Sequence, residues 1–377
     1  MKTKLKDIIV IKKGTKIEPT EFSANSTRFI QIDDLRNDNN IKFCEAEDNY
    51  TFVNEDDDVI VAWDGANAGT IGYGLKGAIG STLARLRIKD KNIIPEYLGI
   101  LLKSKFEYLR STCSGATIPH ISRNALENIE IPLLPLIEQK RIAKVIVKVN
   151  NLITLRDKQI EKLDLLIKSQ FVRMFGDPVS NKKGWETSYL GDLGYFRNGV
   201  NFNQNDKGYT LKFLGVAEFK NNTRIDSVSL LSELKLTKKP SDEYLLRKGD
   251  VVFVRSNGSK ELVGRCVLIG ELEEPATYSG FCIRFRNKIE RILPEFLIRV
   301  LIDENYKRTF KQDSRGANIN NLNQTMLSNL RIIIPPIDLQ NQFAEFVKQI
   351  DKQKFELQKS LNQLNVLYNA LMQKYFG

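Results

Sequence analysis

A long amphipathic pattern and the segment leading into it occur twice in this chain, and the two copies lie 201 positions apart. The matching residues are Gly115-Ala116, Ile118, Leu126, Asn128, Pro135, Gln139, Ala143, Leu163 and Phe175-Gly176, which recur as Gly316-Ala317, Ile319, Leu327, Asn329, Pro336, Gln340, Ala344, Leu364 and Phe376-Gly377. Further upstream the offset falls to 199, 192 and 185, so the second copy carries insertions in its globular part, where loops absorb them. A duplicated chain presents two similar surfaces, which favours a ligand with two parts.

The segments that precede the two amphipathic patterns are predicted to be globular domains that mix strands with helices. Short apolar or alternating runs bounded by Gly, Asn and Asp predict strands in both. One helix is predicted over residues 95–111 and one over 294–310, because each starts with Pro and carries apolar residues at helical spacing. We therefore expect an α+β chain with mixed domains at 1–131 and 178–332, spacer helices at 132–177 and 333–377, and a pseudo-twofold internal repeat.

Proline-marked junctions predict that the long helices begin near Leu136 and Ile337 and end at the two Phe-Gly pairs. Alternating steps of four and three residues trace an apolar coiled-coil seam along each helix. Its members are Ile142, Ile146, Val149, Ile153, Ile160, Leu163 and Ile167 in the first helix, and Phe343, Val347, Ile350, Leu357, Leu361, Leu364 and Leu371 in the second. Such a stripe must be covered in water. An antiparallel pair of the two helices covers both stripes, and the alternative is that each helix folds back on its own domain.

Charge and composition fit a cytoplasmic protein that binds a polyanion. The net charge is +11, and residues 178–332 hold 25 Lys and Arg against 18 Asp and Glu, whereas residues 1–131 hold 18 against 19. A basic balance is compatible with nucleic acid but is also found in many soluble proteins. The polar start excludes a signal peptide, no apolar run is long enough for a membrane span, and four scattered cysteines suit a reducing compartment.

Several kinds of catalytic site are disfavoured by what the sequence lacks. It has one histidine, His120, which argues against a catalytic triad or a His-rich metal site. No phosphate-binding loop motif occurs. The acidic run at 55–58 could hold a metal, but the matching run at 247–250 reverses its charge, so we interpret it as a solvated turn and expect no metal.

Loops supply the candidates for nucleic-acid contact. Two matched loops, residues 63–67 and 255–260, follow predicted strands and combine small residues with polar groups, which suits contact with phosphates and base edges. Ordinary hairpin tips have the same composition. The segments 114–123 and 314–323 could present polar groups at a helix start, with Ile118 and Ile319 plugging the junction. The full candidate set is Lys12, Lys13, Lys16, Asp64, Asn67, His120, Ser122, Arg123, Lys212, Lys220, Arg255, Ser256, Asn257, Ser259, Lys260, Arg315, Asn318 and Asn320.

The whole chain resembles the specificity subunit of type I restriction-modification systems. The resemblance is carried by the order of variable domain, IPLLPLIEQKRIAKVI junction and helix ending FVRMFGDP, followed by a second domain, an IIIPPIDLQNQFAEFV junction and a second helix. Gly115-Ala116-Thr117-Ile118 and Gly316-Ala317-Asn318-Ile319 resemble the signature that ends the family's variable domains.

The resemblance implies a non-catalytic reader of double-stranded DNA. Each globular part would be a target recognition domain for one half of an asymmetric split site. The paired helices would hold these domains apart and dock two methyltransferase subunits. S-adenosylmethionine, ATP and Mg²⁺ would be bound only by those subunits and by the restriction and translocation subunits, so no cofactor is expected on this chain. The target sequence lies in the family's variable part and is not implied.

Two other classes of protein remain open. A fused nuclease could use the acidic clusters with a divalent metal, and DNA cleavage by this chain alone would reveal it. A purely structural coiled-coil adaptor would show no sequence preference in DNA binding.

Overall fold

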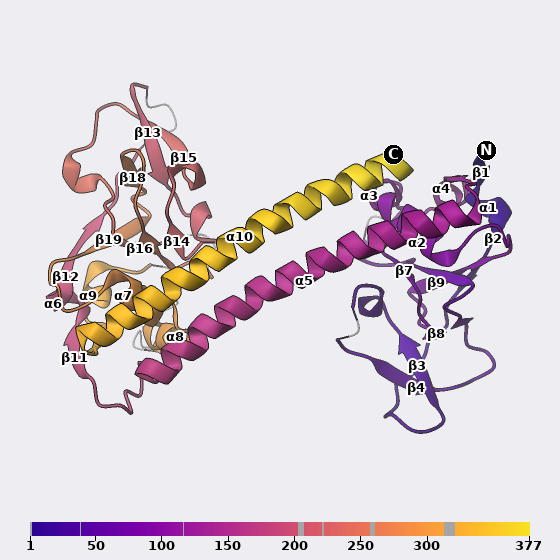
Figure 1. Cartoon of the computed structure of the whole chain (residues 1–377), viewed down its shortest axis with the longest axis horizontal. Coiled ribbons are helices and arrows are strands. Elements are labelled where there is room, and N and C mark those ends of the chain that lie inside the picture. Colours follow the sequence, from indigo (N-terminus) through magenta and orange to yellow (C-terminus); the bar gives the residue numbers. More distant parts are fainter. Residues whose placement is uncertain are drawn as a thin grey trace. The chain divides into compact units, whose positions relative to one another are not determined.

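The computed structural model describes residues 2–37, 39–115, 117–202, 207–220, 222–256, 261–312 and 321–377, without the side chains of 309–312. The chain divides into two compact units. Unit 1 is Met1–Lys158 with Gln358–Gly377, and unit 2 is Gln159–Leu357. Two uninterrupted helices, α5 (Leu136–Phe175) and α10 (Ile337–Phe376), each contribute one part to each unit (Figure 1). They begin at the residues that the junctions predict.

The globular part of unit 1 is built on small sheets. One sheet pairs β1 (Lys2–Lys4) with β10 (Glu130–Pro132), and an antiparallel sheet has the order β2 (Ile9–Lys13), β9 (Leu83–Ile88), β6 (Asp58–Ala62), β7 (Ile71–Tyr73). Another has the order β4 (Lys42–Glu45), β3 (Ser26–Ile30), β8 (Gly77–Ile79), β5 (Phe52–Val53), in which β3 and β8 are parallel. The helices are α1 (Leu5–Ile8), η1 (Asp33–Leu35), α2 (Pro95–Ser104), α3 (Phe106–Ser111) and α4 (Arg123–Glu127).

Unit 2 repeats this plan with additions. One sheet pairs β11 (Glu186–Tyr189) with β20 (Arg331–Ile334), and a larger sheet has the order β12 (Gly194–Asn198), β19 (Cys282–Asn287), β16 (Val251–Val254), β17 (Cys266–Ile269), β14 (Arg224–Ile225). Another has the order β15 (Ser232–Leu236), β13 (Tyr209–Leu214), β18 (Ala276–Tyr278). The helices are α6 (Leu190–Leu193), η2 (Ala217–Lys220), η3 (Val228–Leu230), η4 (Asp242–Tyr244), α7 (Pro294–Ile302), α8 (Glu304–Gln312) and α9 (Gln324–Ser328). β15 pairs with β13 as β4 pairs with β3, whereas β14, at the edge beside β17, has no counterpart in unit 1 and accounts for part of the insertion.

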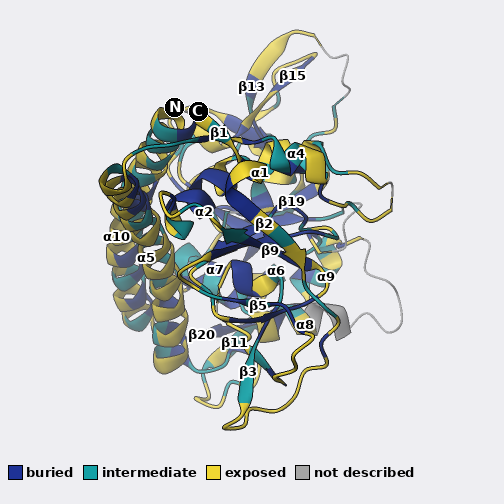
Figure 2. Ribbon diagram, turned by 90° about the vertical axis from the view of Figure 1, so that its right-hand side faces the viewer, coloured by how far each residue is buried: buried dark blue, intermediate teal, exposed yellow. Residues whose placement is uncertain are grey.

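Buried strands at the centre of each main sheet form the cores (Figure 2). Every residue of β6 in unit 1 and of β16 in unit 2 is buried. The apolar residues of α2 and α7 cover these sheets, since Leu98 and Leu101 share one core with Val59, and Leu297 and Leu301 share another with Val251. These continuous apolar runs are typical of strands that are buried on both faces.

The prediction of one helix after each main sheet was wrong, because each segment forms two helices. In unit 1 the break lies at Lys105, whose Nζ donates to the carbonyl oxygen of Phe376 at 2.7 Å. In unit 2 it lies at Asp303, whose backbone is extended. Asp303 Oδ1 accepts hydrogen bonds from the N–H groups of Asn305 and Tyr306 at 2.9 and 3.1 Å. A capping carboxylate starts a new helix more favourably than it continues an old one.

A buried glutamine ties the start of each long helix to its globular part. The amide oxygen of Gln139 accepts from the N–H of Ile94 at 3.1 Å, and its Nε2 donates to the carbonyl of Leu134 at 2.8 Å. Gln340 makes the same two contacts with Leu293 and Pro335, at 2.9 and 2.8 Å. A fully buried amide must satisfy its donors and acceptors. Both copies therefore keep the buried amide with the same two contacts, although the offset between the copies changes from 199 at Ile94 and Leu293 to 201 at the glutamines.

The long helices pair in antiparallel fashion. In unit 1 the start of α5 meets the end of α10, because Ile142, Ile146 and Phe376 share one core. In unit 2 the end of α5 meets the start of α10, where the rings of Phe171 and Phe343 lie 5.5 Å apart. Every residue of the predicted seam is buried or half-buried. The helices therefore cover each other while also packing on the globular cores, so the alternative in which each helix folds back only on its own domain is not observed.

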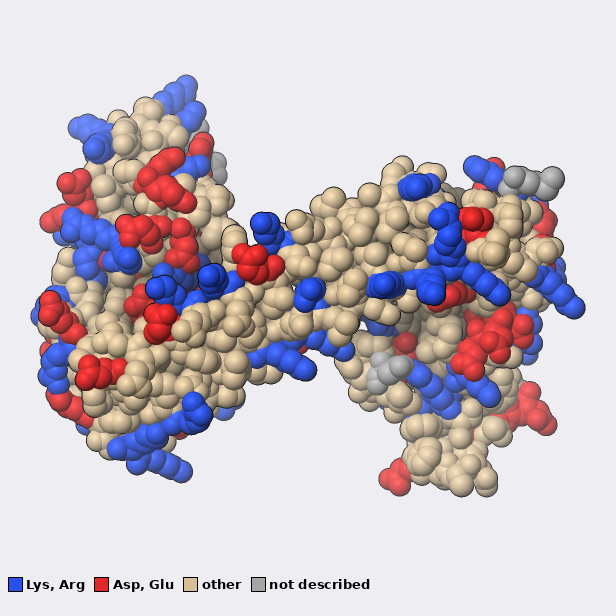
Figure 3. Space-filling view, in the orientation of Figure 1, with Lys and Arg blue, Asp and Glu red and all other residues tan. Residues whose placement is uncertain are grey.

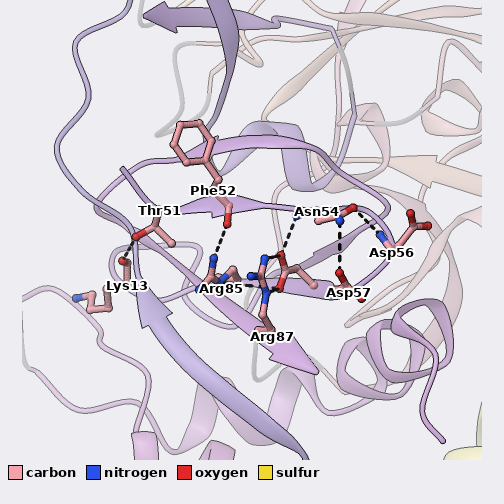
Figure 4. Close-up of polar contacts among 9 residues, drawn as sticks. Lys13, Thr51, Phe52, Asn54, Asp56, Asp57, Arg85 and Arg87 are labelled. Carbon is pink, nitrogen blue, oxygen red and sulfur yellow. Dashed lines mark hydrogen bonds and ion pairs between the residues drawn. The ribbon is translucent and has the colours of Figure 1, made fainter. Parts of the chain in front are cut away.

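A buried ion pair occurs at the same place in both units. Asp58 is fully buried and accepts two hydrogen bonds from Arg87, at 2.9 and 2.7 Å, and one from the N–H of Asn54 (Figure 4). The hydrogen bond with Asp58 raises the pKa of Arg87. In unit 2 Asp250 accepts from Arg286 at 2.7 Å through both carboxylate oxygens. The last residue of the acidic run at 55–58 is therefore a structural partner of an arginine.

Candidate nucleic-acid interface

Three loop segments of unit 1 meet at the end of β6 and form what we call the first loop cluster: Trp63-Asp64, Thr82, and residues 119–121. The N–H groups of Trp63 and Asp64 both donate to the carbonyl of Thr82, at 2.8 and 3.3 Å. The N–H of Ile121 donates to the carbonyl of Trp63 at 2.9 Å. Backbone hydrogen bonds therefore fix this cluster, so the identity of its side chains can differ without changing its backbone.

The second loop cluster in unit 2 has the same backbone pattern: Arg255-Ser256, Phe281, and Asn321-Leu322. Here the N–H groups of Arg255 and Ser256 donate to the carbonyl of Phe281 at 2.8 and 3.4 Å, and the N–H of Leu322 donates to the carbonyl of Arg255 at 2.7 Å. Asp64 and His120 form an isolated β-bridge in unit 1, as Ser256 and Asn321 do in unit 2. Equivalent backbone positions thus carry different side chains in the two clusters.

A glycine lets the strand beside each cluster approach its turn closely. A Cβ atom added to Gly14 would lie 2.2 Å from the carbonyl oxygen of Gly80, and one added to Gly199 would lie 2.2 Å from that of Ser279. No side chain fits at such a distance, so both positions require glycine. The residues just before them, Lys13 and Asn198, are thereby placed beside the two clusters.

Side chains of the first cluster form a charged group around Asp64. Lys13 Nζ lies 2.8 Å from Asp64 Oδ2, and His120 Nδ1 lies 2.6 Å from Asp64 Oδ1. Partial burial alone would raise the pKa of Asp64, but the hydrogen bonds from Lys13 and His120 outweigh it and hold the pKa below its ordinary value. The Asp64 carboxylate thus stays ionised at neutral pH and orients two groups that could bind DNA.

In the second cluster, neutral Asn198 and Asn321 occupy the positions that correspond to Lys13 and His120 of the first. Gln324 Nε2 donates to Asn198 Oδ1 at 3.0 Å, and the Asn323 side chain caps α9 by accepting from the N–H of Met326 at 2.9 Å. Arg255 is half-buried and directly follows β16.

The structure brings together some of the predicted contact residues and separates others. Lys13, Asp64 and His120 meet in the first cluster, and Arg255 and Ser256 belong to the second. The remaining described candidates have local partners or are simply exposed: Lys12 is exposed on β2, Lys16 pairs with Glu18, Asn67 accepts from Arg36, Ser122 caps α4, Arg123 pairs with Glu127, Lys212 pairs with Glu233, and Lys220 is exposed on η2. Asn257, Ser259, Lys260, Arg315, Asn318 and Asn320 lie outside the described residues.

One expectation about the loops was wrong, and one residue was missed. Ile118 does not pack in the junction, because 54% of its surface is exposed. The residue buried there is Ile121, and its counterpart in the second copy is Leu322. Ile319 lies outside the described residues. Phe281 was not among the candidates, although the offset of 199 between the copies already aligned it with Thr82.

Among the residues that the structure describes, no three His, Cys, Asp or Glu side chains gather as metal ligands, and no helix is long and apolar enough to cross a membrane. The four cysteines are free thiols. Burial raises the pKa of Cys266 and of Cys282 to about 12, so neither is a reactive thiolate at neutral pH.

The duplicated fold therefore presents two equivalent loop clusters that differ in their side chains. The model of the type I restriction modification DNA specificity domain matches residues 1–165 and again 182–366. The chain is 31% identical over 356 residues to the type I restriction enzyme MjaVIII specificity subunit of Methanocaldococcus jannaschii, covering 88% of this chain and 82% of that protein. It is 26% identical to the StySPI specificity subunit of Salmonella potsdam, covering 84% and 72%.

The fold is also similar to a solved one. The crystal structure of the type I restriction-modification S subunit from M. genitalium superposes with a TM-score of 0.63 at 16% identity, covering all of this chain and 96% of that one. The chain belongs to the family of type I restriction modification DNA specificity subunits.

Proposed function

We propose that this chain is the DNA-recognition subunit of a type I restriction-modification complex, and that its two globular parts read the two halves of an asymmetric, split site in double-stranded DNA. The observation that carries the proposal is the pair of loop clusters, which share a backbone and differ in side chains. Sequence is read by side chains at base edges, while a fixed backbone sets their register. Two clusters with Lys13, Asp64 and His120 in one and Arg255, Ser256 and Asn321 in the other suit two different half-sites.

The long helices offer surface for protein partners. Apolar side chains with at least 45% of their surface exposed lie along both: Leu155, Leu165 and Val172 on α5, and Phe355, Val366 and Leu367 on α10. Much of the visible surface of these helices is uncharged (Figure 3). Exposed apolar patches of this kind mark interaction sites. They support docking of two methyltransferase subunits, through which restriction and translocation subunits join the complex.

Catalysis belongs to the partners in this proposal. The chain supplies no cofactor site of its own, and S-adenosylmethionine, ATP and Mg²⁺ are bound by the methyltransferase and by the restriction and translocation subunits. The free cysteines support a reducing compartment, the cytoplasm of a prokaryote. The positively charged second globular part supplies more of the sequence-independent affinity, because neutralising phosphates releases counterions.

The test is a comparison of DNA binding and methyl transfer with and without the methyltransferase. We expect the purified chain alone to transfer no methyl groups and the complex to methylate DNA. Arg255→Ala should weaken DNA binding. If Arg255 contacts a base, discrimination at one base pair should fall by roughly 1 to 3 kcal/mol. If it contacts phosphate, affinity should fall equally for all sequences and depend less steeply on salt.

Lys248→Ala is the matched control. Lys248 precedes β16, whereas Arg255 follows it, so the two cations lie at opposite ends of one strand. The exposed ion pair of Lys248 with Glu271 contributes little to the stability of the fold. Methyl transfer by the isolated chain, or unchanged DNA binding by Arg255→Ala, would contradict the assignment.

A further inference from the structure

Phe281 is an exposed aromatic residue held on a rigid turn. It lies between β18 and β19, and 60% of its surface is exposed. Its carbonyl accepts from Arg255 and Ser256, its N–H donates to Ser279 Oγ at 3.1 Å, and the preceding N–H of Gly280 donates to the carbonyl of Val200 at 2.7 Å. The backbone N–H and carbonyl of Phe281 are therefore both fixed by hydrogen bonds, while its ring remains exposed.

The fold does not require an aromatic ring at this position. Among the described residues, no other ring stacks on Phe281, and the adjacent core is already closed by Cys282 and Tyr278, which are fully buried. The first copy builds the same turn with Thr82, which is also exposed. The backbone hydrogen bonds hold this ring beside Arg255 and Ser256 of the second loop cluster, and this fixed position within the candidate interface favours a ligand contact.

The chemistry of the two residues at this turn points to one kind of contact. A phenyl ring has no donor for a phosphate oxygen, so any DNA contact that it makes depends on an apolar group. In the major groove that group is the 5-methyl of thymine, which is recognised by the methyl of Thr and by the ring of Phe. Thr82 and Phe281 share this capacity even though their sizes differ.

We propose that the turn residue is a base-reading position in each half of the molecule, and that Phe281 contacts the 5-methyl group of a thymine in the second half-site. The inference rests on the DNA-reading function proposed above. The side chain excludes water from the methyl group, while Arg255 and Ser256 from the same cluster contact polar base edges or phosphates beside it.

The experiment uses the complex with its methyltransferase and the site found by methylome sequencing. Each thymine of the second half-site is replaced singly by deoxyuridine, which lacks only the methyl group. For one position we expect wild-type binding to fall about fourfold, as burial of one methyl group predicts. Phe281→Ala should bind native DNA several-fold more weakly and should show no further loss with that deoxyuridine, whereas Phe281→Leu should keep part of the discrimination.

Phe22→Ala is the control, because Phe22 is also an exposed aromatic residue but belongs to unit 1, where its ring packs on Phe43. It should leave the deoxyuridine effects at the second half-site unchanged. Three results would overturn the inference. The first is that Phe281→Ala binds with wild-type affinity, and the second is that the second half-site contains no thymine. The third is that the loss caused by Phe281→Ala adds independently to the loss caused by every deoxyuridine. Bipartite methylation that persists in those cases would leave the proposed function standing, while its absence would reject both.

Discussion

A chain that ends at Gly176 is expected to form a homodimer. In unit 1 the last part of α10 covers the start of α5, and Phe376 packs on Tyr97 with ring centroids 5.5 Å apart. The truncated chain lacks that segment but carries its repeat. At the spacing of 201, Phe175 replaces Phe376, and apolar residues replace apolar ones at most seam positions. The exceptions are Arg156 in place of Leu357 and Gln170 in place of Leu371. A true twofold pair can thus replace the internal one.

Sedimentation at micromolar concentration measures the outcome. Ile146→Asp in the truncated chain should abolish the dimer, because Ile146 is buried in the seam, whereas Ile137→Asp on the same helix should not, because Ile137 is highly exposed. With its methyltransferase, the dimer should read a palindromic split site. A folded, soluble monomer of the truncated chain would rule out pairing through the seam.

Phe343→Ala is expected to destabilise unit 2 by about 3 to 5 kcal/mol. Phe343 is fully buried, and its ring lies 5.5 Å from those of Phe171 and Phe175, which in turn contact Phe296 at 5.7 and 4.7 Å. Truncation removes the ring of α10 that packs on these two rings of α5, and it leaves a cavity. For a unit of this size the loss corresponds to a fall in melting temperature of roughly 6 to 20 °C, measured by calorimetry on the full chain.

Phe355→Ala is the matched variant on the same helix. Because 69% of Phe355 is exposed, its removal should change stability by less than about 0.5 kcal/mol. It should instead weaken binding of the methyltransferase, if α10 forms part of the docking surface. A melting temperature of Phe343→Ala equal to that of Phe355→Ala would show that the aromatic cluster does not hold the helices together.

The sequence predicted the long helices well because their signals are local and repeated. The seam recurs for many turns, Pro135 and Pro336 mark the starts, and Gly176 ends α5 with a φ of 78°, the left-handed conformation that glycine favours. The break at Asp303 was also encoded locally, as a capping residue, but the apolar spacing across it concealed the signal. The sheets were less predictable, since strand pairing depends on residues far apart in sequence.

The candidate site was predicted only in part, for a physical reason. Asp64 and Arg255 follow buried strands and could be found from the pattern, but the contact of Lys13 with Asp64 joins residues 51 positions apart. Lys12 and Lys16 could not be distinguished from Lys13 by composition. In the structure Lys12 and Lys13 are neighbours on β2, whereas Lys16 lies beyond the strand and pairs with Glu18. Phe281 was missed because an aromatic residue in a strand-rich segment is expected in the core, and its exposure follows from the turn geometry alone.

Methylome sequencing of cells that carry this chain with its methyltransferase tests the central claim most directly. The account predicts an asymmetric site of two specified halves with an unspecified spacer. Inserting four residues near Lys158 in α5 and near Lys359 in α10 would lengthen each helix by roughly 6 Å, which corresponds to about one or two base pairs, so the same halves should be methylated with a spacer longer by that amount. A single continuous site, or full methylation with an unchanged spacer in the insertion strain, would contradict it.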